Sequence, residues 1–185
     1  MPATETQPSP AEETPEIVLR LERYEDIFSD FDIRPYSRRS LSVDFIDEVK
    51  RAASDKSDGK IELVLLMPEA HKDEHHETVI KERLASHFKK HYNLLSKERG
   101  RIRRLGVKMV VTGIVCLIAA TFVLFKNLSR SFLFSFLVVL LEPAAWFLLW
   151  EGMDQIIFTS KSVNPDLNFY RKMSHPLVHI SFKTY

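Results

Sequence analysis

Two long apolar runs, residues 105–125 and 131–150, dominate the pattern of hydrophobic and polar positions along the chain. A helix needs about 20 residues to cross the hydrocarbon core of a bilayer, and each run has that length. Lys108 is the only charge in the first run and Glu142 the only charge in the second. A soluble helix this long would carry a polar face at helical spacing. The pattern therefore predicts an antiparallel hairpin of two membrane-spanning helices.

Two other interpretations of the apolar runs stay open at this point. The first is a strongly apolar helical hairpin buried inside a soluble protein. The second concerns Pro143, which lacks an N–H and can break the second run into a re-entrant or interfacial segment.

Basic residues decide the expected orientation of the hairpin. Positive side chains are retained on the cytoplasmic side of a membrane. The turn between the runs carries only Lys126 and Arg130, whereas six basic residues crowd the start of the first run. We therefore expect a two-span protein of the cell (inner or plasma) membrane with both chain ends in the cytoplasm. The cluster should also attract anionic lipid headgroups. Its members are Lys97, Arg99, Arg101, Arg103, Arg104 and Lys108.

The residues before the hairpin predict a βαβ unit. Residues 16–24 alternate between apolar and polar positions, which is typical of a strand. Residues 42–53 have apolar positions at helical spacing behind Ser42, a good N-cap residue. Residues 60–67 include a continuous apolar run, which is typical of a strand buried on both faces. A strand, a helix and a strand in this order form a right-handed unit with parallel strands.

The pattern predicts further helices and a strand on both sides of the hairpin. Residues 71–104 are highly charged but keep a narrow apolar stripe, which predicts a long amphipathic helix that is continuous with the first span and bends at Gly100 or Gly106. After the second span, Asn164-Pro165 predicts a break and residues 167–173 a short helix. Residues 175–185 alternate again and predict a third strand beside one of the first two.

Together these elements predict an α+β membrane protein in which a transmembrane hairpin is inserted into a small cytoplasmic α/β domain. Pro-, Thr- and Glu-rich residues 1–15 should form a disordered tail. The expected divisions are residues 16–104 for the α/β domain with its long helix, 105–150 for the hairpin, and 151–185 for a segment that completes the domain.

Composition narrows the function classes. The formal net charge of +1 provides no global field for nucleic acid. The one cysteine, Cys116, lies in the first predicted span, so no intramolecular disulfide is expected. The acidic start lacks the apolar core of a signal peptide, which leaves the first span as the insertion signal.

The second span also carries a distinctive run of residues. Glu142-Pro143-Ala144-Ala145-Trp146-Phe147-Leu148-Leu149-Trp150-Glu151-Gly152-Met153-Asp154 is followed by Phe169-Tyr170-Arg171-Lys172-Met173. This pattern, above all Glu-Pro-x-x-Trp-Phe-x-x-Trp, resembles a group of uncharacterised prokaryotic two-span membrane proteins over about residues 16–185. The resemblance implies the same architecture and brings no activity, cofactor or substrate with it.

Glu142 is the first candidate for chemistry, because an ionisable side chain within a span is costly and often functional. It lies level with Thr112, whose hydroxyl is a potential partner, and Pro143 frees a carbonyl of the same helix. The functional interpretation is a proton or ion relay. The structural interpretations are a neutral Glu142 that fixes helix packing or oligomer register, and a Glu142 that lies shallower in the membrane.

Histidines and arginines supply two further candidates. His87 and His91 have the i, i+4 spacing that lets two imidazoles share a metal, and His71 and His75 are further potential ligands. The alternative is a solvated helix surface. Arginines precede the helix predicted to start near Ser42, a place where anions bind; ordinary surface charge is the alternative. They are Arg34, Arg38 and Arg39.

The chain lacks a G-x-S-x-G motif, a Walker sequence and a Cys–His pair outside the spans, so an enzyme is not expected, nor is a cofactor. The leading hypothesis is a membrane-anchored interaction or scaffold module. Its expected partners are the bilayer and its anionic headgroups, a protein or a second copy, and not nucleic acid. The alternatives are a subunit of a small oligomeric channel or transporter that uses Glu142, and a metal- or anion-dependent membrane enzyme.

Overall fold

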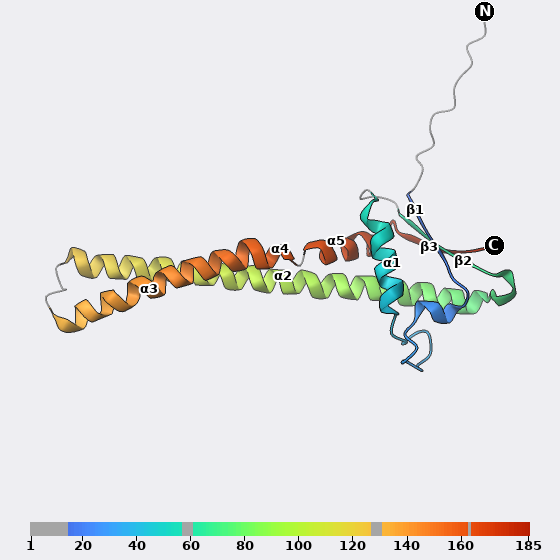
Figure 1. Cartoon of the computed structure of the whole chain (residues 1–185), viewed down its shortest axis with the longest axis horizontal. Helices are drawn as coiled ribbons and strands as arrows, with labels where there is room; N and C mark the ends of the chain where they lie inside the picture. The colour runs from blue at the N-terminus through green and yellow to red at the C-terminus, as the bar shows by residue number, and fades with distance from the viewer. Residues whose placement is uncertain (1–14, 57–60, 127–130, 163) are drawn as a thin grey trace, which may run out of the picture. The chain divides into compact units, whose positions relative to one another are not determined.

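The computed structural model describes residues 15–56, 61–126, 131–162 and 164–185 (Figure 1). These residues form two compact units, of which one contains the chain up to Tyr92 together with Phe169–Tyr185 and the other contains Asn93–Asn168. We call them the α/β unit and the hairpin unit. The predicted tail at residues 1–15 lies outside the described residues except for Pro15.

A three-stranded parallel sheet forms the centre of the α/β unit (Figure 1). Its strands are β1 (Glu16–Arg20), β2 (Glu62–Met67) and β3 (His179–Thr184), in the order β1-β2-β3. Helix α1 (Val43–Ser54) connects β1 to β2. The predicted βαβ unit and the third strand are thereby confirmed, and β3 pairs with β2. The central position of β2 explains its continuous apolar run, because both of its faces need cover.

The core of the α/β unit lies between the sheet, α1 and the first turns of α2 (Glu74–Phe125). Ile80, Leu84 and Phe88 follow at a spacing of four residues, and each is fully buried. Burial of a side chain of this size contributes about 1.5–3 kcal/mol relative to leaving it exposed. The same core includes Ile17, Ile27, Phe28, Phe45, Val49, Leu63, Leu65, Phe169 and Met173.

Helix α2 is a single helix of 52 residues, which confirms that the charged helix and the first apolar run are continuous. Gly100 and Gly106, the expected places for a bend, both lie within it. Gly106 serves close packing, since a Cβ placed on it would lie 2.7 Å from the carbonyl oxygen of Gly152.

The second apolar run forms α3 (Phe132–Asp154), and the chain stays helical through a π-helical turn, η4 (Gln155–Thr159), and α4 (Ser160–Ser162). Pro143 lies inside α3 without ending it, so the alternative interpretation that it breaks the second run is wrong. A separate helix, α5 (Asn164–Met173), follows α4, so a helix does end near the predicted break, but Asn164-Pro165 themselves begin α5. Proline suits the first turn of a helix, where its missing N–H leaves no hydrogen bond unmade.

Small residues line the contact between α2 and α3 in the hairpin unit. Gly113 approaches the backbone of Ala145 so closely that an added Cβ would lie 3.0 Å from its carbonyl oxygen. Ala120 and Ala145 are buried as well. The large apolar side chains lie on the outside instead, among them Ile118, Phe122, Trp146, Phe147 and Trp150. Both helices are long and apolar enough to cross a membrane.

Candidate functional site

A tightly tied loop precedes α1 and builds one wall of the candidate site. Asp32 accepts hydrogen bonds from the guanidinium of Arg34, at 2.7 Å from Nη2 and 2.9 Å from Nε, and from the backbone N–H of Ser40 at 2.7 Å. These contacts hold the pKa of Asp32 well below its usual range, with the Arg34 hydrogen bond as the largest cause. The loop therefore has a defined conformation that is set by one carboxylate.

This loop and α2 enclose a cleft of about 540 Å³, which we call the basic cleft. Arg83 ties its two walls together, because its Nε donates a hydrogen bond to the Arg39 carbonyl oxygen at 3.0 Å. No carboxylate is among the side chains that line it. They are Arg34, Ser37, Arg38, Ser40, Leu41, Arg83, Ser86, His87, Lys90 and His91.

The imidazoles of His87 and His91 stack on each other in the basic cleft, with 4.2 Å between ring centroids, and Tyr170 stacks on His91 at 5.1 Å. Burial lowers the pKa of His87 to about 4, helped by repulsion from His91, Arg83 and Lys90. Burial also lowers the pKa of His91. His87 is therefore neutral at pH 7, and within the described residues its Nε2 is buried without a hydrogen-bond partner.

The four histidines considered as metal ligands do not come together. His87 and His91 stack face to face, whereas His71 lies in a short 3-10 turn, η2 (Glu69–His71), and His75 lies in the first turn of α2. Among the residues that the structure describes, no three His, Cys, Asp or Glu side chains gather where they could hold a metal ion.

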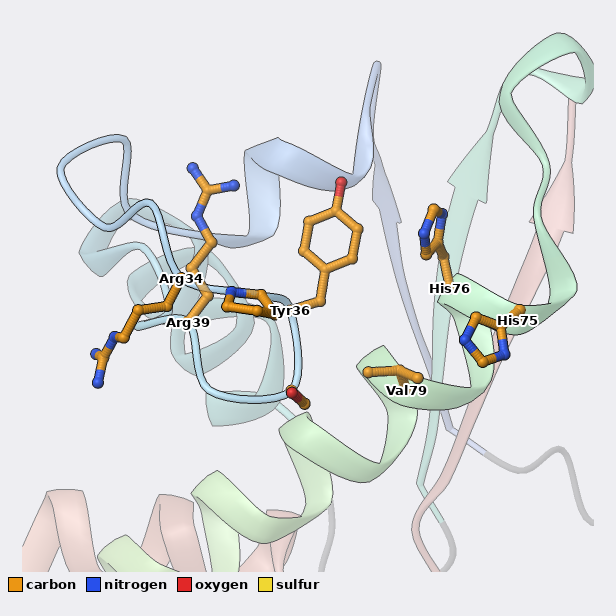
Figure 2. Close-up of a pocket in the computed structure, with 8 residues that line it drawn as sticks. Arg34, Tyr36, Arg39, His75, His76 and Val79 are labelled. Atoms are coloured by element: carbon orange, nitrogen blue, oxygen red, sulfur yellow. The ribbon is translucent and has the colours of Figure 1, made fainter.

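A second cleft, of about 480 Å³, lies between the same loop and the start of α2, and it shares Arg34 and Ser37 with the basic cleft. Figure 2 shows Tyr36 of the loop facing His76 at the start of α2, with a T-shaped contact at 5.2 Å between ring centroids. Tyr36 also stacks on Phe28 and donates a hydrogen bond to Glu25. Burial, together with that hydrogen bond, raises the pKa of Tyr36 to about 12. Val79 adds an apolar wall, and we call this space the aromatic cleft.

The start of α2 is fixed beside the aromatic cleft by Asp73. Its carboxylate accepts hydrogen bonds from the backbone N–H groups of His75 and His76, at 2.8 and 3.1 Å. Its own N–H donates to the hydroxyl of Tyr24 at 2.9 Å. The N–H bonds lower the pKa of Asp73, as expected of a carboxylate at a helix start. Both walls of the aromatic cleft are therefore held in place by hydrogen bonds.

The candidate residues of the two apolar runs line neither cleft. Glu142 is exposed on the surface of the hairpin unit, and no hydrogen bond or ion pair joins it to another described residue. Thr112 does not bond to it as expected, because its Oγ1 donates to the Lys108 carbonyl oxygen of its own helix at 2.9 Å. Pro143 is exposed next to Glu142. The six basic residues expected at the headgroups, 97, 99, 101, 103, 104 and 108, are all exposed.

Comparison with protein-family models, with curated proteins and with solved structures yields no match to this chain. Its function must therefore be argued from its own residues.

Two of the predicted anion-binding residues, Arg34 and Arg38, line the basic cleft. His87 and His91, which were predicted separately as metal ligands, line the same cleft. Arg83 and Lys90, the other two cations of the cleft, were not predicted from the sequence. A signal was present, because residues 83, 87, 90 and 91 share one face of α2 at helical spacing.

Proposed function

We propose that the chain is a membrane-anchored binding module, in which two spans hold a small α/β unit at the cytoplasmic surface. The observation that supports membrane anchoring is the apolar outer surface of the hairpin unit, where the side chains of Phe122 and Trp146 are 57% and 66% exposed. Water-soluble proteins rarely expose contiguous apolar surface of this kind. A lipid environment removes the free-energy penalty of exposing these apolar side chains to water. Helices α2 and α3 are suited to it because they satisfy their backbone hydrogen bonds internally.

The distribution of basic residues supports the proposed orientation. Six of them lie near the point where α2 becomes apolar, and all are exposed. Positive charge at this place favours retention on the cytoplasmic side and contact with anionic headgroups. The α/β unit would then face the cytoplasm.

Cysteine labelling in intact cells tests the anchor and its orientation together. Cys116→Ala provides a cysteine-free background, to which Ser131→Cys or Ser96→Cys is added; both positions are exposed. An impermeant maleimide should label residue 131 directly and residue 96 only after permeabilisation. Extraction of the chain by alkaline carbonate would refute the anchor, and direct labelling of residue 96 would refute the orientation.

The binding role is supported by the two clefts of the α/β unit, whose walls are fixed by hydrogen bonds before any ligand arrives. Preformed sites lose less conformational entropy on binding. A partner that binds the aromatic cleft should co-purify with the full chain in mild detergent and be lost with Val79→Lys. Thr78→Lys, an exposed neighbour on the same helix, is the matched control. Equal recovery with both variants would argue against this cleft as the binding surface.

A second candidate function, a subunit of an oligomeric channel or transporter, is favoured by the exposure of Glu142. A carboxyl group facing hydrocarbon costs about 2.5–3.5 kcal/mol on insertion scales. Packing against a second copy would remove that cost, and several copies are needed to enclose a pore. Proton or ion flux into liposomes that depends on Glu142 would support this function, and its absence would leave the binding module.

A further inference from the structure

We propose that the basic cleft binds a phosphate group, held by the cationic side chains of Arg38, Arg83 and Lys90. The phosphate would belong either to a soluble ester or to a lipid headgroup, since both present the same oxygens. This inference goes beyond the proposed function, because the cleft lies wholly within the α/β unit and does not require the anchor.

Charge is the first argument. Four cations line the cleft, and only Arg34 is neutralised, by its ion pair with Asp32 at 2.7 Å. Arg38, Arg83 and Lys90 form no ion pair with a carboxylate among the described residues. Cations gathered without carboxylates repel one another, and an anion relieves this repulsion. A phosphate monoester carries about −1.5 to −2 charges at pH 7 and therefore matches three cations better than a carboxylate does.

Hydrogen bonding points to the same ligand. Guanidinium and ammonium groups only donate, so the cleft offers many donors and needs a ligand rich in acceptors. A phosphate group has three terminal oxygens that accept charge-assisted hydrogen bonds. The hydroxyls of Ser37, Ser40 and Ser86 are additional donors on the walls. A metal cation is disfavoured by the same surroundings.

The cleft is also preorganised for an anion. Arg83 uses Nε to hold the Arg39 carbonyl oxygen, which fixes its guanidinium and directs the remaining N–H groups elsewhere. Asp32 fixes the opposite wall through Ser40. Because the geometry of Arg83 is set before binding, little of its side-chain entropy remains to be lost. The volume of about 540 Å³ exceeds that of a phosphate group, leaving space for the moiety that carries it.

The same loop offers a way to tell the two sources apart. Phe31 and Ile33 are 99% and 96% exposed, on either side of Asp32. Apolar side chains next to a basic site suit insertion between lipid headgroups. They would contribute to binding of a lipid phosphate and not to binding of a soluble one.

The test uses the full chain in phosphatidylcholine nanodiscs and follows the thermal midpoint of the α/β unit by near-ultraviolet circular dichroism. Inorganic phosphate replaces chloride at constant ionic strength in one arm, and phosphatidic acid is added to the nanodiscs in the other. A ligand that binds the folded state raises the midpoint. We expect a rise in at least one arm, and the arm that responds identifies the source.

Variants make the test specific. Arg38→Gln and Lys90→Gln should each weaken binding about tenfold through the loss of a charge-assisted hydrogen bond. Lys89→Gln removes an equal charge from the neighbouring position outside the cleft and should retain the full rise. Phe31→Ser with Ile33→Ser should reduce only the phosphatidic acid response. No rise in either arm would overturn the proposal, as would equal losses for Lys89→Gln and the cleft variants.

Discussion

Gly106 and Gly152 approach each other so closely that a Cβ on either would lie within 2.8 Å of the other's carbonyl oxygen. Real Cβ atoms do not come this close to an oxygen, so the backbones of α2 and α3 would have to separate. Only glycine permits this contact, which makes it the closest backbone approach between the two helices at any described glycine.

Gly106→Ala should therefore destabilise the hairpin unit by about 1–3 kcal/mol, the usual cost of overpacking. Thermal unfolding in detergent, followed by the fluorescence of Trp146 and Trp150, measures the effect. Gly100→Ala is the control, because a Cβ there meets nothing within 4 Å. Replacing a helical glycine in open space should instead stabilise by about 0.5–1 kcal/mol. Equal effects of the two variants would mean that the helices do not pack through Gly106.

Glu142→Gln should leave the protein folded and in the same oligomeric state, because Glu142 is exposed and an amide has nearly the same size and shape as a carboxyl group. Light scattering in detergent measures the assembly size. A change in that size would show that the charge of Glu142, and not only its hydrogen bonding, matters for assembly.

Acid should weaken the α/β unit through His87. Its pKa is about 4 in the folded chain and near the ordinary 6.5 in the unfolded chain, so well above pH 6.5 neither state binds this proton. Below that pH the unfolded chain takes up the proton first, and the free energy of unfolding falls until about pH 4. Allowing for solvent screening, the loss is about 1–2 kcal/mol.

The His87→Gln variant should flatten this part of the pH profile, measured as the thermal midpoint between pH 7.5 and 4.5. His71→Gln, at an exposed position, is the control and should keep the wild-type profile. A profile that His87→Gln leaves unchanged would place the acid sensitivity elsewhere.

Tyr36→Phe should raise the pKa of Glu25. The Tyr36 hydroxyl is the largest cause of the lowered value, because it donates a hydrogen bond to the charged carboxylate. Carbon-detected NMR titration of the Glu25 side chain measures the change. Tyr92→Phe, which leaves this hydrogen bond intact, should not shift the titration. An unaltered Glu25 pKa in Tyr36→Phe would mean that the hydrogen bond does not form in solution.

Much of the fold follows from local pattern. Alternation at residues 16–20 and the apolar run in β2 identify the strands, and the stripe of Ile80, Leu84 and Phe88 identifies the buried face of α2. A new helix starts close to the predicted break at Asn164-Pro165, but these two residues lie in its first turn, since proline suits a helix start as well as a break. The rotation of α3 about its own axis was not predictable, because a helix with apolar residues on all sides does not show which side packs against its neighbour. Glu142 therefore lies on the exposed surface, away from the expected contact with Thr112.

The basic cleft could not be predicted from local sequence patterns. Arg34 and Arg38 are separated from Arg83 and Lys90 by an entire helix and strand. Nothing in the local spacing of either group reveals the other. Their proximity depends on the loop conformation set by Asp32 and on where α2 crosses it, and both are tertiary features.

The position of β3 also constrains how the protein is made. Residues 169–185 supply the edge strand of the sheet and cover part of the core, yet a ribosome synthesises them only after the hairpin. The nascent α/β unit must therefore wait with one side of β2 unpaired until the hairpin and the segment after it have been synthesised. If the hairpin enters a bilayer as proposed, its insertion would precede completion of the sheet, and an unpaired strand edge in that interval is a surface that chaperones protect from aggregation.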